Sequence, residues 1–275
     1  MAKIVKIDSL SDIRIKHYIS LTESQLRNRL EPEEGILIAE SLKVIHTALE
    51  AGIEPISFLM PKKHISGQAA ELLSFYPDVP VFTGEDNILE GITGYRLTRG
   101  ILCAMKRPLL PSIKKVIGDK QRIAILENVV DSTNIGAIFR SAAALGMDGI
   151  VLSPNCCDPF NRRSIRVSMG SVFQVPWTYL SDRTDGFSQN GLKEIHANGY
   201  RIVAMALSNH TISIEDPILN HEEKLAIVMG SEGNGLSDFI LDQCDETVTI
   251  PMKNNVDSLN VAAASAIAFW QLRKH

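Results

Sequence analysis

The feature that most constrains the fold is the stretch of residues 225–264, which brings two short apolar segments and two turns close together in the sequence. The apolar segment 225–229 ends in a glycine-rich turn, GSEGNG, and a second segment at 247–250 runs into the tripeptide IPM. Turns that follow buried parallel strands meet at one edge of an open α/β sheet, where ligands bind. The stretch therefore predicts a ligand site built from two strand ends.

A helix of small residues follows these turns. Ser258, Leu259 and Asn260 precede a run of alanines. Ser258 is predicted to cap the helix 258–273, because a serine hydroxyl accepts hydrogen bonds from the first free backbone amides of a helix. The small side chains favour close packing against another helix or another subunit.

Alternating apolar segments predict an α/β fold with two domains. Short apolar runs suit strands, and the segments between them carry apolar residues at helical spacing. The pattern breaks at 106–121, which contains prolines, a glycine and several basic residues and is interpreted as a linker. We predict a first domain at 1–105 and a second at 122–275, with parallel strands buried on both faces. The strands expected in the second domain are 122–127, 149–152, 175–179, 201–207, 225–229 and 247–250, and its helices are 133–144, 162–169, 187–198, 236–243 and 258–273.

Composition excludes several classes of protein. With 28 basic and 32 acidic side chains the formal net charge is −4, which argues against a nonspecific nucleic-acid coat protein. The four cysteines form no CxxC pair and lack a histidine cluster, so neither a disulfide scaffold nor a metal site is expected. The charged amino-terminus resembles no signal peptide, and no apolar run is long enough to cross a membrane. These observations favour a cytoplasmic protein.

Two local basic clusters stand out against the acidic total. Residues 1–29 carry more basic than acidic side chains and include Arg27 and Arg29, and a second cluster consists of Arg162, Arg163 and Arg166. Such clusters permit an RNA partner, because phosphate contacts supply most of the affinity for nucleic acid. A solvated surface is the alternative for each.

The glycine-rich turn at 230–235 differs from the common nucleotide-binding loops. Leu236 follows its last glycine where a P-loop needs lysine, and its order GxxGxG is not the dinucleotide fingerprint GxGxxG. Glycines still let backbone approach a ligand closely. Glu232 lies between glycines, where an acid has little packing to do, so we interpret the turn as a binding loop with a purely structural turn as the alternative.

A third motif, NIGAIFR, lies just past the first strand of the second domain. Asn134 follows the strand end, and Gly136 and Arg140 are four residues apart on the helix, so they share one face. A ligand can approach a helix closely at glycine, and an arginine one turn later can reach it. The alternative for Arg140 is an ion pair with a surface acid.

Taken in order, NIGAIFR, IVMGSEGNGLS and IPM followed by DSLNVAAASA resemble the three motifs of the SpoU/TrmH group of SPOUT RNA methyltransferases. The segment RRSIRVSMGSVFQVPW at 162–177 is also similar to the family between its first and second motifs. In the first domain, GILIAESLKVIHTALEAG resembles the small RNA-binding domain of ribosomal-protein L30e type that many members carry.

The resemblance implies S-adenosylmethionine as cofactor, a trefoil knot in the second domain, and a homodimer with the site at the subunit interface. Asn254 stands where the family usually has glycine after IPM, and asparagine tolerates the left-handed turn required there. The residues that match the family's catalytic positions are Asn134, Arg140, Glu232, Ser258 and Asn260. Those that match its cofactor-binding positions are Ala206, Gly230, Ile250 and Leu259.

The activity that the resemblance implies is transfer of a methyl group to the ribose 2′-hydroxyl of RNA. Ribosomal RNA is favoured over transfer RNA, because the first domain resembles one from a ribosomal protein. Two alternatives stay open at this point: methylation of a base by the same fold, and a catalytically idle RNA-binding assembly factor.

Overall fold

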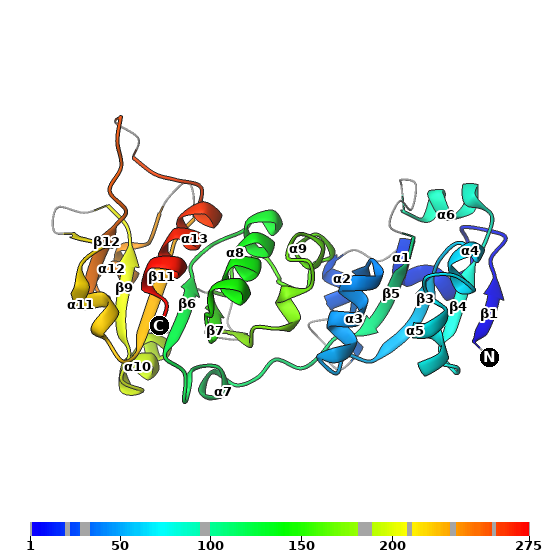
Figure 1. Ribbon diagram of the computed structural model, residues 1–275, viewed down its shortest axis with the longest axis horizontal. Helices are drawn as coiled ribbons and strands as arrows, with labels where there is room; N and C mark the ends of the chain where they lie inside the picture. The colour runs from blue at the N-terminus through cyan, green and yellow to red at the C-terminus, as the bar shows by residue number, and fades with distance from the viewer. Residues whose placement is uncertain are drawn as a thin grey trace. The chain divides into compact units, whose positions relative to one another are not determined.

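The computed structural model describes residues 2–19, 23–27, 34–93, 100–180, 189–207, 211–231, 235–254 and 257–274. The chain divides into two compact units, each with strands and helices (Figure 1). Unit 1 consists of Met1–Leu109 and Phe160–Phe173, and unit 2 consists of Leu110–Pro159 and Gln174–His275. The α/β class expected from the sequence is confirmed in both units.

Unit 2 is built around a seven-stranded sheet in which all neighbouring strands are parallel. Three of its strands are buried at every residue, as parallel strands covered by helices should be. The spatial order is β10 (Ile212–Ser213), β12 (Glu246–Thr249), β9 (Arg201–Met205), β11 (Leu225–Met229), β6 (Arg122–Leu126), β7 (Gly149–Leu152) and β8 (Trp177–Tyr179). After β8 the chain thus returns across the sheet, and β11 inserts between β9 and β6.

Two helices of unit 2, α8 (Ser132–Leu145) and α13 (Val261–Leu272), pack against each other (Figure 1). Helix α8 ends at Gly146, whose φ of +78° is the left-handed conformation that glycine adopts without strain. The cap predicted for α13 is wrong. Asn260, not Ser258, accepts hydrogen bonds from the first free amides, because the helix begins at Val261 and places Asn260 at the capping position.

The segment 106–121, predicted as a linker, contains helix α7 (Ile113–Ile117). Val116 and Ile117 are fully buried in the core of unit 2, so this segment packs as part of the unit although prolines and basic residues surround it. The remaining helices of unit 2 are α10 (Gln189–Ala197), α11 (Pro217–His221) and α12 (Asp238–Leu241).

Unit 1 contains a mixed five-stranded sheet. Its strands lie in the order β1 (Lys3–Lys6), β4 (Pro80–Thr83), β3 (Pro55–Leu59), β5 (Leu102–Lys106) and β2 (Ile36–Glu40). The first three are parallel, and β5 runs antiparallel to both β3 and β2. Around the sheet lie η1 (Ile13–Ile15), α1 (Lys16–Ile19), α2 (Glu23–Arg27), α3 (Leu42–Glu50), α4 (Lys62–Ile65), α5 (Ala70–Phe75) and α6 (Asp86–Thr93).

The segment Phe160–Phe173 belongs to unit 1 although it lies far along the chain. Its helix α9 (Arg162–Val167) packs on β2, and its 3₁₀ turn η3 (Ser171–Phe173) contacts α3. The rings of Phe160 and Phe173 stack at 5.7 Å, and the guanidinium of Arg107 lies 4.8 Å from the centre of the Phe160 ring. The structure therefore differs from the sequence-based boundary, which assigned every residue after 121 to the second domain.

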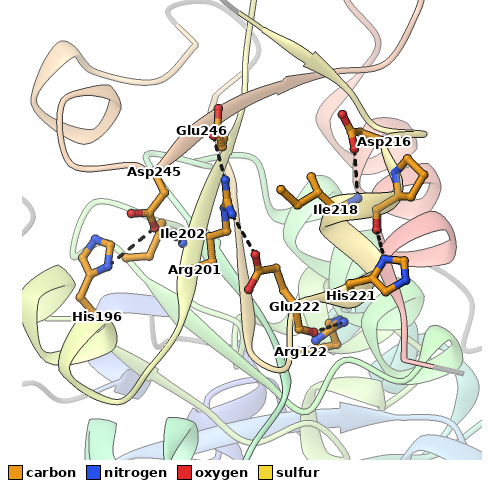
Figure 2. A network of polar contacts seen from close by, with 11 residues as sticks. Arg122, His196, Arg201, Ile202, Asp216, Ile218, His221, Glu222, Asp245 and Glu246 are labelled. Carbon is orange, nitrogen blue, oxygen red and sulfur yellow. Dashed lines mark hydrogen bonds and ion pairs between the residues drawn. The ribbon is translucent and has the colours of Figure 1, made fainter.

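Polar side chains join the segments at the start of the strands of unit 2 (Figure 2). The fully buried Arg122 guanidinium donates hydrogen bonds of 2.7–3.1 Å to the carbonyls of Gln121, Glu222, Glu223 and Leu272. Nearby, Arg201 pairs with the carboxylates of Glu222 and Glu246, each at 2.8 Å. Arg122 thereby connects the first strand of the unit with the end of α13.

Candidate functional site

A cavity of about 410 Å³ lies at the carboxyl ends of three neighbouring strands of unit 2, β9, β11 and β12. The residues that precede α13 and its first turn complete the wall. This is the sheet edge at which open α/β structures bind ligands. The cavity is lined by Met205, Ala206, Leu207, Met229, Gly230, Ser231, Gly235, Leu236, Leu241, Val248, Thr249, Ile250, Met252, Asp257, Ser258, Leu259, Val261 and Ala264.

The structure brings together all four residues that the resemblance assigns to cofactor binding. Ala206, Gly230, Ile250 and Leu259 each line the cavity, and each follows a different strand end or precedes α13. Ser258, assigned to catalysis, lines the same cavity. Asn254, in the loop between Ile250 and α13, has a φ of +59°, so the left-handed turn expected there is confirmed.

The glycine-rich turn folds back on itself at the carboxyl end of β11. The amide of Gly235 donates to the carbonyl of Ser231 at 3.2 Å, and the two residues form an isolated antiparallel bridge. A Cβ atom on Gly230 would lie 2.6 Å from the carbonyl carbon and oxygen of Gly235 and 2.8 Å from the amide nitrogen of Leu236. Residue 230 must therefore be glycine for the turn to close.

Replacing Gly230 by alanine is expected to weaken binding of S-adenosylmethionine by at least about tenfold, because the new methyl group forces the turn away from its closed shape. Isothermal titration calorimetry measures the affinity. Gly199→Ala is the control for a loss of stability away from the cavity, because alanine strains the backbone there at a φ of +83° but Gly199 does not line the cavity. Equal affinity of Gly230→Ala and the wild type would contradict a binding role for the turn.

Two of the residues assigned to catalysis, Asn134 and Asn260, meet where α8 and α13 begin. The side-chain amide of Asn260 donates to Oδ1 of Asn134 at 3.1 Å, joining residues that are 126 positions apart. Oδ1 of Asn260 simultaneously caps α13, and the carboxylate of Asp131 accepts from the amides of Thr133 and Asn134 to cap α8. Both asparagines are thus held by helix ends that sequence spacing alone could not bring together.

Arg140 lies two turns further along α8. Its side chain is exposed, and it has no hydrogen-bond or ion-pair partner among the residues that the structure describes. The alternative of an ion pair with a surface acid finds no support in that part of the chain. Arg140 also does not line the cavity. Two other predicted residues, Glu232 and Arg29, lie outside the described residues.

Arg27 of the first basic cluster and the arginines of the second lie on helices that pack on the same strand of unit 1. Helix α2, which carries Arg27, and helix α9 both pack on β2. Within α9 the arginines differ: the Arg162 guanidinium lies 3.7 Å from the carboxylate of Glu40, which is 5% exposed, whereas Arg163 and Arg166 are exposed. Arg162 therefore has a partner inside unit 1, and Arg163 and Arg166 present basic surface.

Sequence reasoning missed Glu127, which follows β6 and is 4% exposed. Its carboxylate accepts from the amide of Ser237 at 2.9 Å and from the Ser237 hydroxyl at 2.6 Å. An acid directly after the apolar residues 123–126 of a buried strand is the signal that could have indicated it, because buried carboxylates need partners. Met205, Met229 and Met252, which line the cavity, were missed for a different reason: apolar residues at strand ends look like core.

No helix in the described segments is long and apolar enough to cross a membrane. Within the same segments, no group of three or more histidine, cysteine, aspartate or glutamate side chains is arranged to hold a metal ion.

A family model places the chain among known proteins. Residues 121–270, more than half of the chain, match the SpoU rRNA methylase family. An uncharacterised tRNA/rRNA methyltransferase of Mycobacterium bovis is 31% identical over 262 residues, covering 94% of this chain and 88% of the relative. The 23S rRNA guanosine 2′-O-methyltransferase RlmP of Bacillus subtilis is 30% identical over 172 residues, covering 62% of this chain and 63% of the relative.

Solved structures share the fold over nearly the whole chain. An rRNA methyltransferase of Sinorhizobium meliloti, solved with S-adenosylmethionine bound, has a TM-score of 0.81 at 22% identity and covers 98% of this chain and 97% of its own. The SpoU methyltransferase AviRb of Streptomyces viridochromogenes has a TM-score of 0.77 at 22% identity, with 94% and 95% covered. The chain therefore belongs to the SpoU rRNA methylase family and is an RNA methyltransferase that uses S-adenosylmethionine.

Proposed function

We propose that this protein methylates the ribose 2′-hydroxyl of RNA, with ribosomal RNA as its substrate. The observation that carries the proposal is the double role of residues 257–260. Ser258 and Leu259 line the cavity, whereas Asn260, directly after them, hydrogen-bonds Asn134 on the helix that carries Arg140. One short segment thus joins the proposed cofactor site to the proposed acceptor site.

The cavity suits S-adenosylmethionine by size and by chemistry. Its volume falls in the range of small-molecule sites. Met205, Met229 and Val248 supply apolar surface for an adenine ring, and Ser231, Thr249 and Asp257 supply polar atoms for hydroxyl and ammonium groups. Gly230 and Gly235 both line the cavity, and neither has a side chain that would cover its backbone. Ala206, Gly230, Ile250 and Leu259 would hold the cofactor through their backbone groups.

The bound cofactor supplies an activated methyl group, so the protein must mainly align and activate the acceptor. A guanidinium stays protonated in proteins and is a poor proton acceptor, so Arg140 is not assigned the role of base. Arg140 instead clamps the ribose and its phosphate and stabilises the negative charge that develops on the 2′-oxygen. Its exposure and lack of partners in the described chain leave it available for this contact.

The other assigned residues orient the reacting groups. Asn134 and Asn260 hold each other through their 3.1 Å hydrogen bond and fix the acceptor side. Ser258 lines the cavity two residues before Asn260. The role that we propose for Glu232 is to orient Arg140. The proton of the 2′-hydroxyl leaves to water or to a phosphate oxygen.

Substrate binding is assigned to unit 1, as the RNA-binding domain of L30e type, and to the basic surface around β2. Arg27 and Arg29 from the amino-terminal region and Arg162, Arg163 and Arg166 from α9 form the proposed RNA-binding set, in which Arg162 acts by fixing α9 to Glu40. The activity of the Bacillus subtilis relative on 23S rRNA supports ribosomal RNA. Exposed Ile267 and Trp270 on α13 support a homodimer, and we place the protein in the cytoplasm, where RNA is modified.

The activity is tested with the purified protein, labelled S-adenosylmethionine and total RNA from a strain that lacks the gene. Nuclease digestion of the product should give a 2′-O-methylated nucleoside, and the site of missing methylation should map to ribosomal RNA. A labelled base would instead show base methylation, and the absence of cofactor binding in calorimetry would show an idle RNA-binding protein. Either result would reject the proposal.

Removing both exposed arginines of α9 is expected to weaken RNA binding and to flatten its salt dependence. For single-stranded RNA, each lost phosphate contact should reduce the slope of log K against log salt by about 0.7, so Arg163→Ala with Arg166→Ala should reduce it by about 1.4. Filter binding at several salt concentrations measures the slope.

The matched control replaces Lys62 and Lys63 of α4 by alanine, which removes the same charge from exposed positions elsewhere on unit 1. This control should bind RNA nearly as the wild type does. Equal slopes for the two double variants would remove α9 from the RNA-binding surface.

A further inference from the structure

The carboxylate of Glu127 is buried. Its side chain is 4% exposed, and both of its described hydrogen bonds come from one residue, Ser237. Within the described chain no lysine, arginine or histidine forms an ion pair with it. Burying a charge is expensive unless it is paired, so an apolar side chain would serve the stability of the fold better at this position.

The two ends of the glycine-rich turn are fastened to this one residue. At one end the backbone amide of Glu127 donates to the carbonyl of Met229, the last residue of β11, at 2.9 Å. At the other end the carboxylate binds the amide and hydroxyl of Ser237, and that hydroxyl also caps α12 by accepting from the amide of Ile240 at 3.4 Å. The described parts of the turn, residues 230–231 and 235–236, are therefore next to two points set by Glu127.

These parts of the turn form a wall of the cavity. Gly230, Ser231, Gly235 and Leu236 line it, and the turn is already closed by the contact between Ser231 and Gly235. Closing a turn in advance removes an ordering cost that a ligand would otherwise bear on binding. Glu127 itself does not line the cavity.

We propose that Glu127 is a positioning residue that, through Ser237, pre-shapes Gly230, Ser231, Gly235 and Leu236 for S-adenosylmethionine. The proposal rests on the proposed placement of the cofactor in this cavity. Glutamine at position 127 has only one side-chain oxygen to accept hydrogen bonds from the amide and the hydroxyl of Ser237. Its NH₂ group is a donor and cannot accept the second hydrogen bond. The turn then opens more often, and the cofactor must close it on binding.

The test measures the affinity of the full-length protein for S-adenosylhomocysteine by calorimetry. Glu127→Gln and Ser237→Ala are each expected to weaken binding about 10- to 100-fold, as loss of an outer hydrogen-bond partner does at other sites. The double variant should bind no more weakly than the weaker single variant, because both substitutions break the same contact. Ser237→Thr retains the hydroxyl and the amide and should restore nearly wild-type affinity.

Hydrogen exchange without ligand separates positioning from general stability. In Glu127→Gln, exchange of the amides of Ser231, Gly235 and Leu236 should accelerate, whereas amides of β7 and β8 should keep their wild-type rates. The control Glu246→Gln makes the same substitution in the pair with Arg201 at the opposite ends of the strands, and it should change neither affinity nor exchange at the turn.

The outcomes distinguish the two proposals. If the wild type binds no S-adenosylhomocysteine, the placement of the cofactor is wrong. If the wild type binds and Glu127→Gln and Ser237→Ala bind equally well, the role of Glu127 is wrong. If exchange accelerates throughout unit 2, Glu127 acts on general stability, and the proposal is likewise overturned. If Glu127→Gln fails to fold, Ser237→Ala, which removes only a hydroxyl, provides the same measurement.

Discussion

Replacing Arg140 by alanine is expected to lower the rate of methyl transfer to RNA by about 100- to 1000-fold while leaving the affinity for S-adenosylmethionine unchanged. The rate falls because the proposed clamp on the developing 2′-oxyanion is lost, and loss of one such group has effects of this size in other enzymes. The affinity is retained because Arg140 does not line the cavity. Transfer of labelled methyl to RNA in single-turnover experiments gives the rate, and calorimetry gives the affinity.

Arg140→Lys is the conservative variant with which Arg140→Ala is compared. Lysine keeps the positive charge but lacks the planar pair of donors that binds a phosphate or ribose. The rate of methyl transfer by Arg140→Lys should therefore lie between those of the wild type and Arg140→Ala. Transfer by Arg140→Ala at nearly the wild-type rate would remove Arg140 from the mechanism. A parallel loss of cofactor affinity would place it in the cofactor site instead.

Replacing Arg122 by methionine is expected to lower the free energy of unfolding of unit 2 by about 3 to 5 kcal/mol. Methionine fills much of the volume of this fully buried side chain but leaves the carbonyls of Glu222, Glu223 and Leu272 without their donor. Both tryptophans of the chain, Trp177 and Trp270, belong to unit 2. Chemical denaturation followed by tryptophan fluorescence therefore reports on this unit.

Arg201→Met is the matched control for Arg122→Met. Arg201 pairs with two carboxylates in the same region (Figure 2), but its side chain is 24% exposed. Water screens such pairs, so its loss should lower stability by about 1 kcal/mol or less. If the two methionine variants lost stability equally, burial of the Arg122 hydrogen bonds would not be the cause of its effect.

The strands of unit 2 could be predicted from sequence because their signal is local. The apolar runs at 122–127, 149–152 and 225–229 correspond to β6, β7 and β11, which are buried on both faces and contain no competing polar pattern. Strand β1 was missed because it lies at an edge and is largely exposed, so its sequence KIVK carries no continuous apolar run. Strand β10 has only two residues and offers no pattern.

The candidate site was partly predictable. The glycine-rich turn and the residues before α13 could be located because each follows a recognisable strand, and the resemblance then assigned roles to them. The contact of Glu127 with Ser237 joins residues 110 positions apart, and the return of α9 to unit 1 depends on its packing against β2. Local sequence contains no information about either pairing. The trefoil knot implied by the resemblance stays a prediction for the same reason.

The residues that complete the cavity come late in the sequence. Its walls come from the ends of β9, β11 and β12, but Val261 and Ala264 of α13 close it. A chain that has not yet added α13 to the sheet therefore lacks the site. By mass action, a ligand that binds only the completed structure increases the population of finished molecules. With S-adenosylmethionine in this cavity as proposed, the cofactor is therefore expected to stabilise the fully folded protein and to slow its proteolysis.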